Sequence, residues 1–186
     1  MTETTQPEPE GTRRDFIHIM TGAVAAGGVA AVVWPFIAQM NPAADTLALA
    51  TIEVDMGALS PGQEISVFWR GKPVFIRYRT PENIEAARAV DVASLPDAQS
   101  DDERLAPGPD GALKPEYLVM VGICTHLGCV PLGNGAGDYD GWFCPCHGSH
   151  YDQSGRIRKG PAPSNLEVPP YAYLSDTRVV LGRDEA

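Results

Sequence analysis

The sequence predicts a mainly β protein, an antiparallel head tethered to one N-terminal transmembrane helix. Three observations lead to this fold class. Residues 16–40 carry no formal charge over 25 positions. Short runs of β-type residues follow, and the 19 Gly and 17 Pro of the chain favour a turn-rich fold over a helical bundle. All four cysteines lie within 23 consecutive positions, which predicts a small subdomain built around a metal site, a disulfide or both.

The N-terminal region predicts membrane insertion. Residues 1–15 form a polar segment that ends in Thr12-Arg13-Arg14-Asp15, and together with Phe16 this resembles a twin-arginine export signal. A helix over 16–40 can cross a hydrocarbon core of about 30 Å, because about 20 residues suffice. The paired arginines should stay on the cytoplasmic side. We therefore expect a single-pass protein of a bacterial inner membrane, with its C-terminal head in the periplasm.

A cleaved signal peptide is the alternative to a retained anchor. Ala48-Leu49-Ala50 fits the small-residue rule for a cleavage site. The apolar run, however, exceeds the usual h-region of about 7–15 residues, and polar residues separate it from that site. Retention is therefore favoured. Residues 41–50 then form a flexible hinge of small residues, which could extend over about 33–36 Å, and residues 51–186 form the periplasmic domain.

Alternating patterns place the first strands of the head. Gln63–Trp69 alternates, with Ile65, Val67 and Trp69 on one face, and Lys72–Arg79 follows after a short loop that contains Gly71, which predicts a hairpin. Further elements are expected as strands over 117–121 and 177–181 and as a helix over 81–90. Residues 91–116 lack periodicity and are predicted to be a surface insertion.

The formal net charge of -10 argues against a nucleic-acid partner, since such a surface repels phosphate backbones. Near the C-terminal end of the cysteine-rich region, Arg156, Arg158 and Lys159 are interpreted as a solvated run of charges.

Two sequence boxes carry the chemistry. The first reads Cys124-Thr125-His126-Leu127-Gly128-Cys129, and the second reads Cys144-Pro145-Cys146-His147-Gly148-Ser149-His150-Tyr151. Their common core is Cys-x-His, seventeen intervening residues, then Cys-x-x-His. Thiolates suit iron and zinc, and imidazole suits several metals. Alternate residues of an extended segment share a face, so Cys124 and His126 can bind one centre.

A structural zinc site is the alternative, because two Cys and two His form a legitimate tetrahedral zinc set. The spacing argues against it, since zinc modules of this kind pair Cys-x₂₋₄-Cys with His-x₃₋₅-His. Two further cysteines, Cys129 and Cys146, lie within the boxes. In an exported protein these two can form a disulfide. A thioredoxin-like site is weaker still, because the sequence has Cys-x-Cys rather than Cys-x-x-Cys.

These boxes resemble the Rieske iron–sulfur subunit of ubiquinol–cytochrome c reductase, the cytochrome bc complex. The resemblance extends over the anchor, the linker, both boxes and Gly160-Pro161-Ala162-Pro163, and nothing is transferred to 91–116. It implies a Rieske-type head with a cluster-binding part at about 120–164 and one 2Fe–2S cluster per subunit. Cys124 and Cys144 would bind one iron, and His126 and His147 the other.

The resemblance also implies roles for neighbouring residues. Cys129 and Cys146 would form a disulfide that clamps the two loops. Ser149 and Tyr151 would donate hydrogen bonds to cluster or ligand sulfur, which tunes a metal centre. Four residues would form an apolar docking tip around the His-ligated iron: Leu127, Gly128, Pro161 and Pro163.

By the same resemblance, the expected function is that of a catalytic redox subunit of quinol–cytochrome c reductase. The cluster oxidises ubiquinol, with His147 against the quinol oxygen, and passes one electron to a c-type cytochrome. The expected partners are the cytochrome b subunit, the c-type cytochrome, ubiquinol and the membrane, in a dimeric complex. A Rieske ferredoxin-type carrier for another membrane oxidoreductase is the alternative. Soluble ferredoxins and oxygenase input domains are disfavoured because they lack an anchor.

Overall fold

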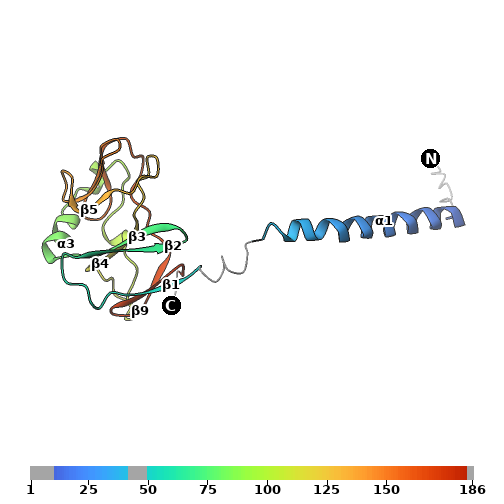
Figure 1. The fold of residues 1–186 in the computed structure, drawn as a ribbon, viewed down its shortest axis with the longest axis horizontal. Coiled ribbons are helices and arrows are strands. Elements are labelled where there is room, and N and C mark those ends of the chain that lie inside the picture. Colours follow the sequence, from blue (N-terminus) through green and yellow to red (C-terminus); the bar gives the residue numbers. More distant parts are fainter. Residues whose placement is uncertain (1–10, 42–49, 184–186) are drawn as a thin grey trace, which may run out of the picture. The chain divides into compact units, whose positions relative to one another are not determined.

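The computed structural model describes residues 11–41 and 50–183 (Figure 1). The chain divides into two compact units, the first ending at Leu47 and the second beginning at Ala48. The first contains one helix and the second is the head, and each is described by itself. Most of the predicted hinge, 42–49, and most of the predicted N-terminal segment lie outside the described residues.

The first unit is helix α1, Arg13–Ala38. Its N-terminus is fixed by a capping box, in which the Thr12 side chain accepts from the Asp15 N–H and the Asp15 carboxylate accepts from the Thr12 N–H. The helix continues through Pro35 and buries none of its residues within the unit. By length and composition it is the one described helix that could cross a membrane. The helix begins three residues before the start of the predicted span, 16–40, and ends two residues before the end of that span.

The head is built from short strands with a few helical turns. Its strands are β1 (Ile52–Asp55), β2 (Glu64–Trp69), β3 (Lys72–Tyr78), β4 (Tyr117–Val121), β5 (Leu132–Ala136), β6 (Gly141–Cys144), β7 (Ser149–Tyr151), β8 (Ile157–Lys159), β9 (Tyr171–Ser175) and β10 (Arg178–Leu181). Helix α3 spans Pro81–Arg88, and two short 3₁₀ turns follow at Val92–Ser94 and Asp102–Arg104.

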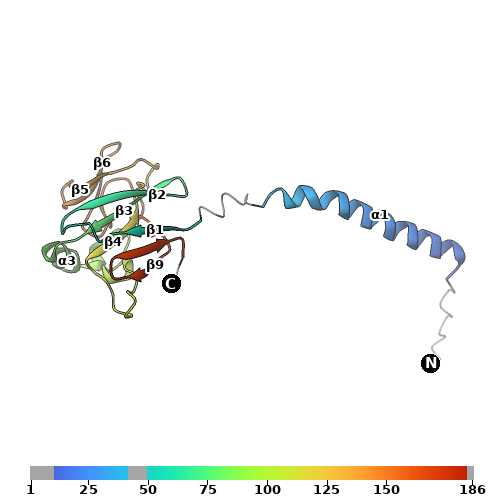
Figure 2. The same cartoon turned by 60° about the horizontal axis from the view of Figure 1, so that its bottom comes forward.

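Within residues 50–183 the strands form three antiparallel sheets, ordered β1-β10-β9, β2-β3-β4 and β5-β6-β7-β8. In both ribbon views the β2-β3-β4 sheet lies between the other two (Figures 1 and 2). One hydrophobic core fills the space between the β1-β10-β9 and β2-β3-β4 sheets. A second core lies between β2-β3-β4 and the cluster-binding part of the head. The predicted mainly antiparallel fold is confirmed.

The central position of the β2-β3-β4 sheet explains its sequence. Along β4, Tyr117 and Val119 enter the first core, whereas Leu118 and Met120 enter the second. All five residues of β4 are buried. A strand buried on both faces reads as a continuous hydrophobic run rather than an alternating one. The predicted strand over 117–121 is confirmed with these bounds.

The predicted β2–β3 hairpin is also confirmed. The register pairs Trp69 with Lys72, so Arg70 and Gly71 form a two-residue turn. Both have positive φ, 50° and 75°, as a type I′ turn requires. Trp69 belongs to the first core and Ile65 and Val67 pack against it, as the alternation predicted.

The prediction of a surface insertion over 91–116 is wrong for its central part. Asp101 and Arg104 are buried. Asp101 accepts two hydrogen bonds, of 2.6 and 3.1 Å, from the fully buried Arg79, the residue that follows β3. The Ser154 hydroxyl donates to the same carboxylate. Arg104 donates to the carbonyls of Ser154 and Leu166 at 2.7 and 2.6 Å. The segment lacks periodicity because buried charges hold it in place together with two separate leucines, Leu95 and Leu105, rather than a continuous apolar face.

The predicted solvated run of charges is wrong at its first residue. Arg156 is buried, and its guanidinium binds the Asp152 carboxylate at 2.9 Å and the Ala87 carbonyl at 2.7 Å. Arg158 is partly buried, and only Lys159 of the three is exposed. The ion pair with Asp152 is local, but Ala87 is 69 residues away in the sequence, so the burial of Arg156 could not be predicted from its neighbours.

We predict that Asp101 stabilises the head far more than its neighbour Asp102. Asp101→Asn leaves the Arg79 guanidinium buried beside a neutral side chain, which should cost about 3–5 kcal/mol in the free energy of unfolding. Asp102→Asn is the matched control, because Asp102 pairs with Arg88 at the surface and should contribute at most about 1 kcal/mol. Urea unfolding followed by circular dichroism measures both. Equal losses would contradict the prediction.

The same pair predicts a pH dependence. Burial alone would raise the pKa of Asp101, but the hydrogen bond and charge of Arg79 outweigh it and lower the pKa below its ordinary value. Its contribution to stability is therefore complete above the unfolded-state pKa and is lost as the pH falls below about 4. Asp101→Asn should remove this acid-side loss from the stability profile.

Candidate metal centre

Two loops built in the same way form the centre of the candidate site. The first follows β4 and the second connects β6 to β7. In each, the carbonyl of the first cysteine accepts a hydrogen bond from a glycine N–H four residues later, Gly128 to Cys124 at 2.9 Å and Gly148 to Cys144 at 3.0 Å. Both glycines have a positive φ, 81° and 77°, and a Cβ at either would meet nothing within 4 Å. The left-handed backbone, not a lack of space, therefore favours glycine here.

A third loop, residues 160–163, closes over the second. Gly160 has φ of 108°, and a Cβ there would clash with the carbonyl oxygen of Gly148. The Ala162 N–H donates to the Ser149 hydroxyl at 3.2 Å. The sequence box that the resemblance included, Gly160–Pro163, thus lies directly against the second cysteine loop.

The two predicted histidine ligands are brought together at the surface. The ring centroids of His126 and His147 lie 4.7 Å apart, with the rings nearly perpendicular at 84°. His126 is half-buried and His147 is exposed. The two predicted cysteine ligands, Cys124 and Cys144, are each 2% exposed and belong to the second core. The site therefore has sulfur donors inside and imidazole donors outside.

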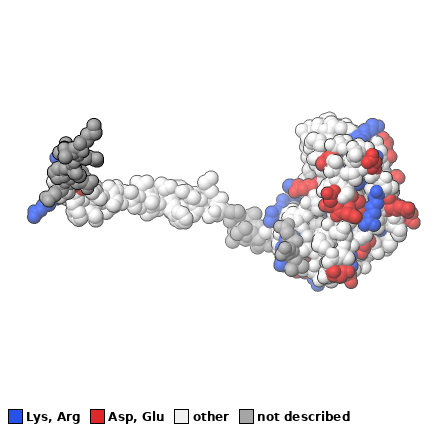
Figure 3. Space-filling model, turned by 180° about the vertical axis from the view of Figure 1, so that it is seen from behind, with Lys and Arg blue, Asp and Glu red and all other residues white. Residues whose placement is uncertain are grey.

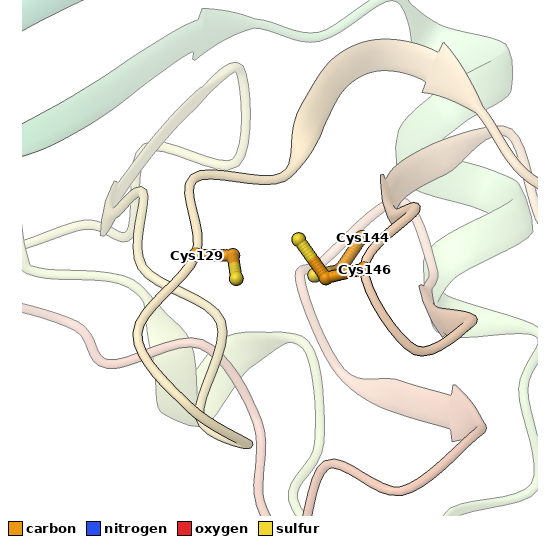
Figure 4. Close-up of side chains that lie close together, drawn as sticks. All are labelled: Cys129, Cys144 and Cys146. Carbon is orange, nitrogen blue, oxygen red and sulfur yellow. The ribbon is translucent and has the colours of Figure 1, made fainter.

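The remaining cysteines lie beside this set. The Sγ atoms of Cys129, Cys144 and Cys146 all lie within 4.8 Å of one another, with Cys129 across from the other two (Figure 4). All four cysteines of the chain are described and are free thiols in the structure. The Cys129 thiol makes a hydrogen bond with Cys146, which raises the pKa of Cys129. Three sulfurs this close could themselves bind a metal. Of the three, Cys144 is the one whose thiol also forms a hydrogen bond with Cys124, the other proposed cysteine ligand.

Hydrogen bonds converge on the buried sulfurs. The Tyr151 hydroxyl donates to Cys124 Sγ at 3.3 Å and accepts from the Thr125 N–H at 3.3 Å. Burial alone would raise the pKa of Cys124, but hydrogen bonds outweigh it and lower the pKa below its ordinary value; they come from Tyr151, the His126 backbone, Cys144 and Ser149. Burial raises the pKa of Cys144 to about 12.

The sequence did not single out Thr125, which joins two of the loops. Its hydroxyl donates to the Ser164 carbonyl at 2.6 Å, and its N–H meets Tyr151. Thr125 stands between the two ligand positions of the first box, which is the one local signal that could have indicated it.

The donor set fits a 2Fe–2S cluster with two sulfur and two nitrogen ligands. Anionic thiolates are costly to bury without donors, and Cys124 has several. Neutral imidazoles can remain at the surface, where His126 and His147 lie. When bound, such a cluster would be held by Cys124, Cys144, His126 and His147, with Tyr151 and Ser149 as donors to sulfur.

Comparison with known families agrees with this geometry. Residues 100–171 match the family model described as the Rieske 2Fe-2S domain. Residues 3–43 match the model described as the ubiquitinol-cytochrome C reductase Fe-S subunit TAT signal. An iron–sulfur subunit of ubiquinol–cytochrome c reductase from Rhodospirillum rubrum is 61% identical over 95% of this chain and 94% of its own length.

The chain belongs to the family of ubiquinol–cytochrome c reductase iron–sulfur subunits. The corresponding proteins of Bradyrhizobium diazoefficiens and Rhodobacter capsulatus are 59% and 50% identical, each over 92% of this chain, and the chain covers 94% and 96% of them. A solved chain titled "Hyperthermophilic respiratory Complex III" matches with a TM-score of 0.50 and 26% identity, over 88% of this chain and 98% of that chain.

Membership in this family decides between the alternatives. The predicted Rieske-type cofactor and the predicted membrane-associated redox subunit are confirmed. A structural zinc module does not account for the Rieske match. The alternative of a ferredoxin-type carrier for another oxidoreductase is not favoured. The match to reductase iron–sulfur subunits includes the export signal and the N-terminal apolar helix in addition to the head.

We predict that each of Cys124, His126, Cys144 and His147 is required for the cluster. Replacing any one by Ala removes a bond to iron, so iron content and the visible spectrum should be lost. His150→Ala is the matched control, because its ring accepts from the Asp138 N–H and lies outside the predicted ligand set. Stoichiometric iron and an unchanged spectrum in any of the four variants would remove that residue from the ligand set.

We predict that Tyr151 and Ser149 raise the reduction potential. Reduction adds negative charge to the cluster, so hydrogen bonds to sulfur strengthen in the reduced state. If about half of a bond worth roughly 1.5–3 kcal/mol differs between redox states, each donor contributes roughly 30–65 mV. Tyr151→Phe and Ser149→Ala should each lower the potential with the cluster retained. Redox titration measures this, and an unshifted potential in either variant would contradict the role of that residue.

Proposed function

We propose that this subunit oxidises ubiquinol at the cytochrome b subunit and passes one electron to the complex's c-type cytochrome. The observation that carries the proposal is the pair of imidazoles, His126 and His147, gathered at the surface of a Rieske domain while Cys124 and Cys144 are buried. Electron and proton donors outside the protein can reach such histidines. The names of the relatives, which are reductase subunits, support the same reaction.

His147 is proposed as the residue that meets the quinol oxygen. It is the more exposed of the two histidines, and one ring nitrogen remains free when the other binds metal. When bound, the cluster supplies a one-electron acceptor of high potential, because His ligands replace Cys ligands on one iron. His147 would take the quinol proton at its free nitrogen as the electron leaves the quinol.

A docking tip is proposed around these histidines. Leu127 is 70% exposed, and Gly128, Pro161 and Pro163 are exposed as well. The space-filling view shows a broad uncharged area at the end of the head formed by the cluster-binding part (Figure 3). An apolar surface next to the histidines suits burial against the cytochrome b subunit and exclusion of water from the quinol.

A hinge over 41–50 is proposed to let the head reach both cytochromes. Its head end is defined in the structure, because the Trp69 indole N–H donates to the Ala50 carbonyl at 2.8 Å. We further propose that α1 is the retained anchor, that the head lies in the bacterial periplasm and that the complex is dimeric. The two arginines at the start of α1 support the orientation.

We propose that Cys129 and Cys146 form a disulfide in the exported protein. The contact between their thiols supports it, as does the oxidising compartment. Removing either cysteine should loosen the two loops by about 2–4 kcal/mol and make the cluster labile without abolishing it. Mass mapping of cysteines in the mature protein tests the bond, and two free thiols there would refute it.

The proposed reaction predicts how the potential depends on pH. A ligand histidine would hold its outer proton more firmly beside a reduced cluster than beside an oxidised one, so a proton would accompany the electron. Over the pH range in which one proton accompanies one electron, the potential of the complex should fall by about 59 mV per pH unit. Titration between pH 5 and 10, followed by electron paramagnetic resonance, measures it. The same spectra should change when a quinol-site inhibitor is added. A potential that does not depend on pH, together with spectra that the inhibitor does not change, would contradict the proposal.

A further inference from the structure

A half-buried carboxylate lies behind the strand that carries one of the proposed ligands. Glu64, at the start of β2, accepts a hydrogen bond from the Trp142 indole N–H at 3.0 Å. Trp142 is 0% exposed and lies on β6, two residues before Cys144. Ile65, next along β2, faces the first core. Because side chains alternate along a strand, Glu64 faces the cluster-binding part.

A glycine and an arginine from two other strands lie close to Glu64 and to Trp142. On β5, a Cβ at Gly133 would clash with the Glu64 carboxylate, so the glycine permits the close approach of that strand. The Arg77 guanidinium, from β3, lies 5.2 Å from the centroid of the Trp142 ring. Burial raises the pKa of Glu64 above its ordinary value, although the Trp142 hydrogen bond and the charge of Arg77 partly oppose this.

Trp142 links this carboxylate to both proposed cysteine ligands. It shares β6 with Cys144 and is paired in register with Tyr151. Tyr151 in turn donates to Cys124 Sγ. Trp142, Tyr151 and both cysteines belong to the same buried core, so the Glu64 carboxylate contacts the core that holds the hydrogen-bonded sulfurs. A charge beside such a core acts on it strongly, because burial reduces the effective dielectric and excludes screening ions.

We propose that the negative charge of Glu64, held against β6 by Trp142, lowers the reduction potential of the cluster. Reduction adds an electron, and a fixed, half-buried anion nearby makes that addition less favourable. Glu64 would thus offset the donors to sulfur, Tyr151 and Ser149, which act in the opposite direction. The inference rests on the proposed ligand set, Cys144 above all, and makes Glu64 a positioning residue that acts through its field rather than by contact with quinol.

Glu64→Gln in the full complex tests the proposal, because Gln is nearly isosteric and can still accept from Trp142. At neutral pH and above, loss of the charge should favour reduction by about tenfold, which corresponds to about 59 mV for one electron. Glu64→Asp retains the charge and should stay closer to the wild-type potential. Glu53→Gln is the matched control, because Glu53 pairs with Arg178 at the surface of the remote β1-β10 pair and should not move the potential.

The pH dependence gives a second readout. The charged groups that face Glu64 are Arg77 from β3 and, beyond it, Asp140 in the turn before β6. When Glu64 becomes protonated at acid pH, the wild-type potential should approach that of Glu64→Gln. An unchanged potential in Glu64→Gln, an equal shift in Glu53→Gln, or equal shifts in the Asp and Gln variants would each overturn the proposal. Failure of the ligand set would instead show as retention of the cluster signal in Cys144→Ala.

Discussion

The structure depends on one constraint, which is that two cysteine sulfurs are buried while two histidine rings beside them stay at the surface. Two loops meet this constraint with the same turn, a carbonyl closed by the N–H of a left-handed glycine. The turn reverses the chain within four residues. It lets the first residue of each box belong to the core while the histidine that follows lies outside it. The arrangement agrees with the match to the Rieske domain model, and the proposed exposure of His147 to quinol follows from it.

The three layers of the head make such burial possible in a small domain. The β2-β3-β4 sheet packs on one face against β1-β10-β9 and on its other face against the cluster-binding part. Buried polar contacts then connect the layers, since Asp101 forms an ion pair with Arg79 and Arg104 donates hydrogen bonds to the carbonyls of Ser154 and Leu166. A buried ion pair contributes little net stability against an apolar replacement, but it is costly to break by removing one partner. These contacts therefore fix the position of the 91–116 segment.

Opposing electrostatic effects meet at the cysteines. Tyr151 and Ser149 favour negative charge on sulfur. The carboxylate of Glu64, on the far side of Trp142, opposes further negative charge. A quinol oxidant needs a potential that is high enough to accept an electron and low enough to pass it on. The balance between hydrogen-bond donors and a half-buried anion offers a physical means of setting that value.

The sequence by itself determined the parts of this protein that rest on local patterns. The two boxes, the uncharged run of α1, the β2–β3 hairpin and the continuous apolar run of β4 each express a spacing within a few residues, so they could be predicted directly. The short strands β5 to β9 could not, because three to five residues are too few to carry a usable period. Tertiary structure alone decided that Asp101, Arg104 and Arg156 are buried, and that Glu64 contacts Trp142. Each has a partner that is distant in the chain, such as Ala87 for Arg156 and Trp142 for Glu64, 69 and 78 residues away. The identity of a charged residue does not reveal whether water or a distant buried partner compensates its charge.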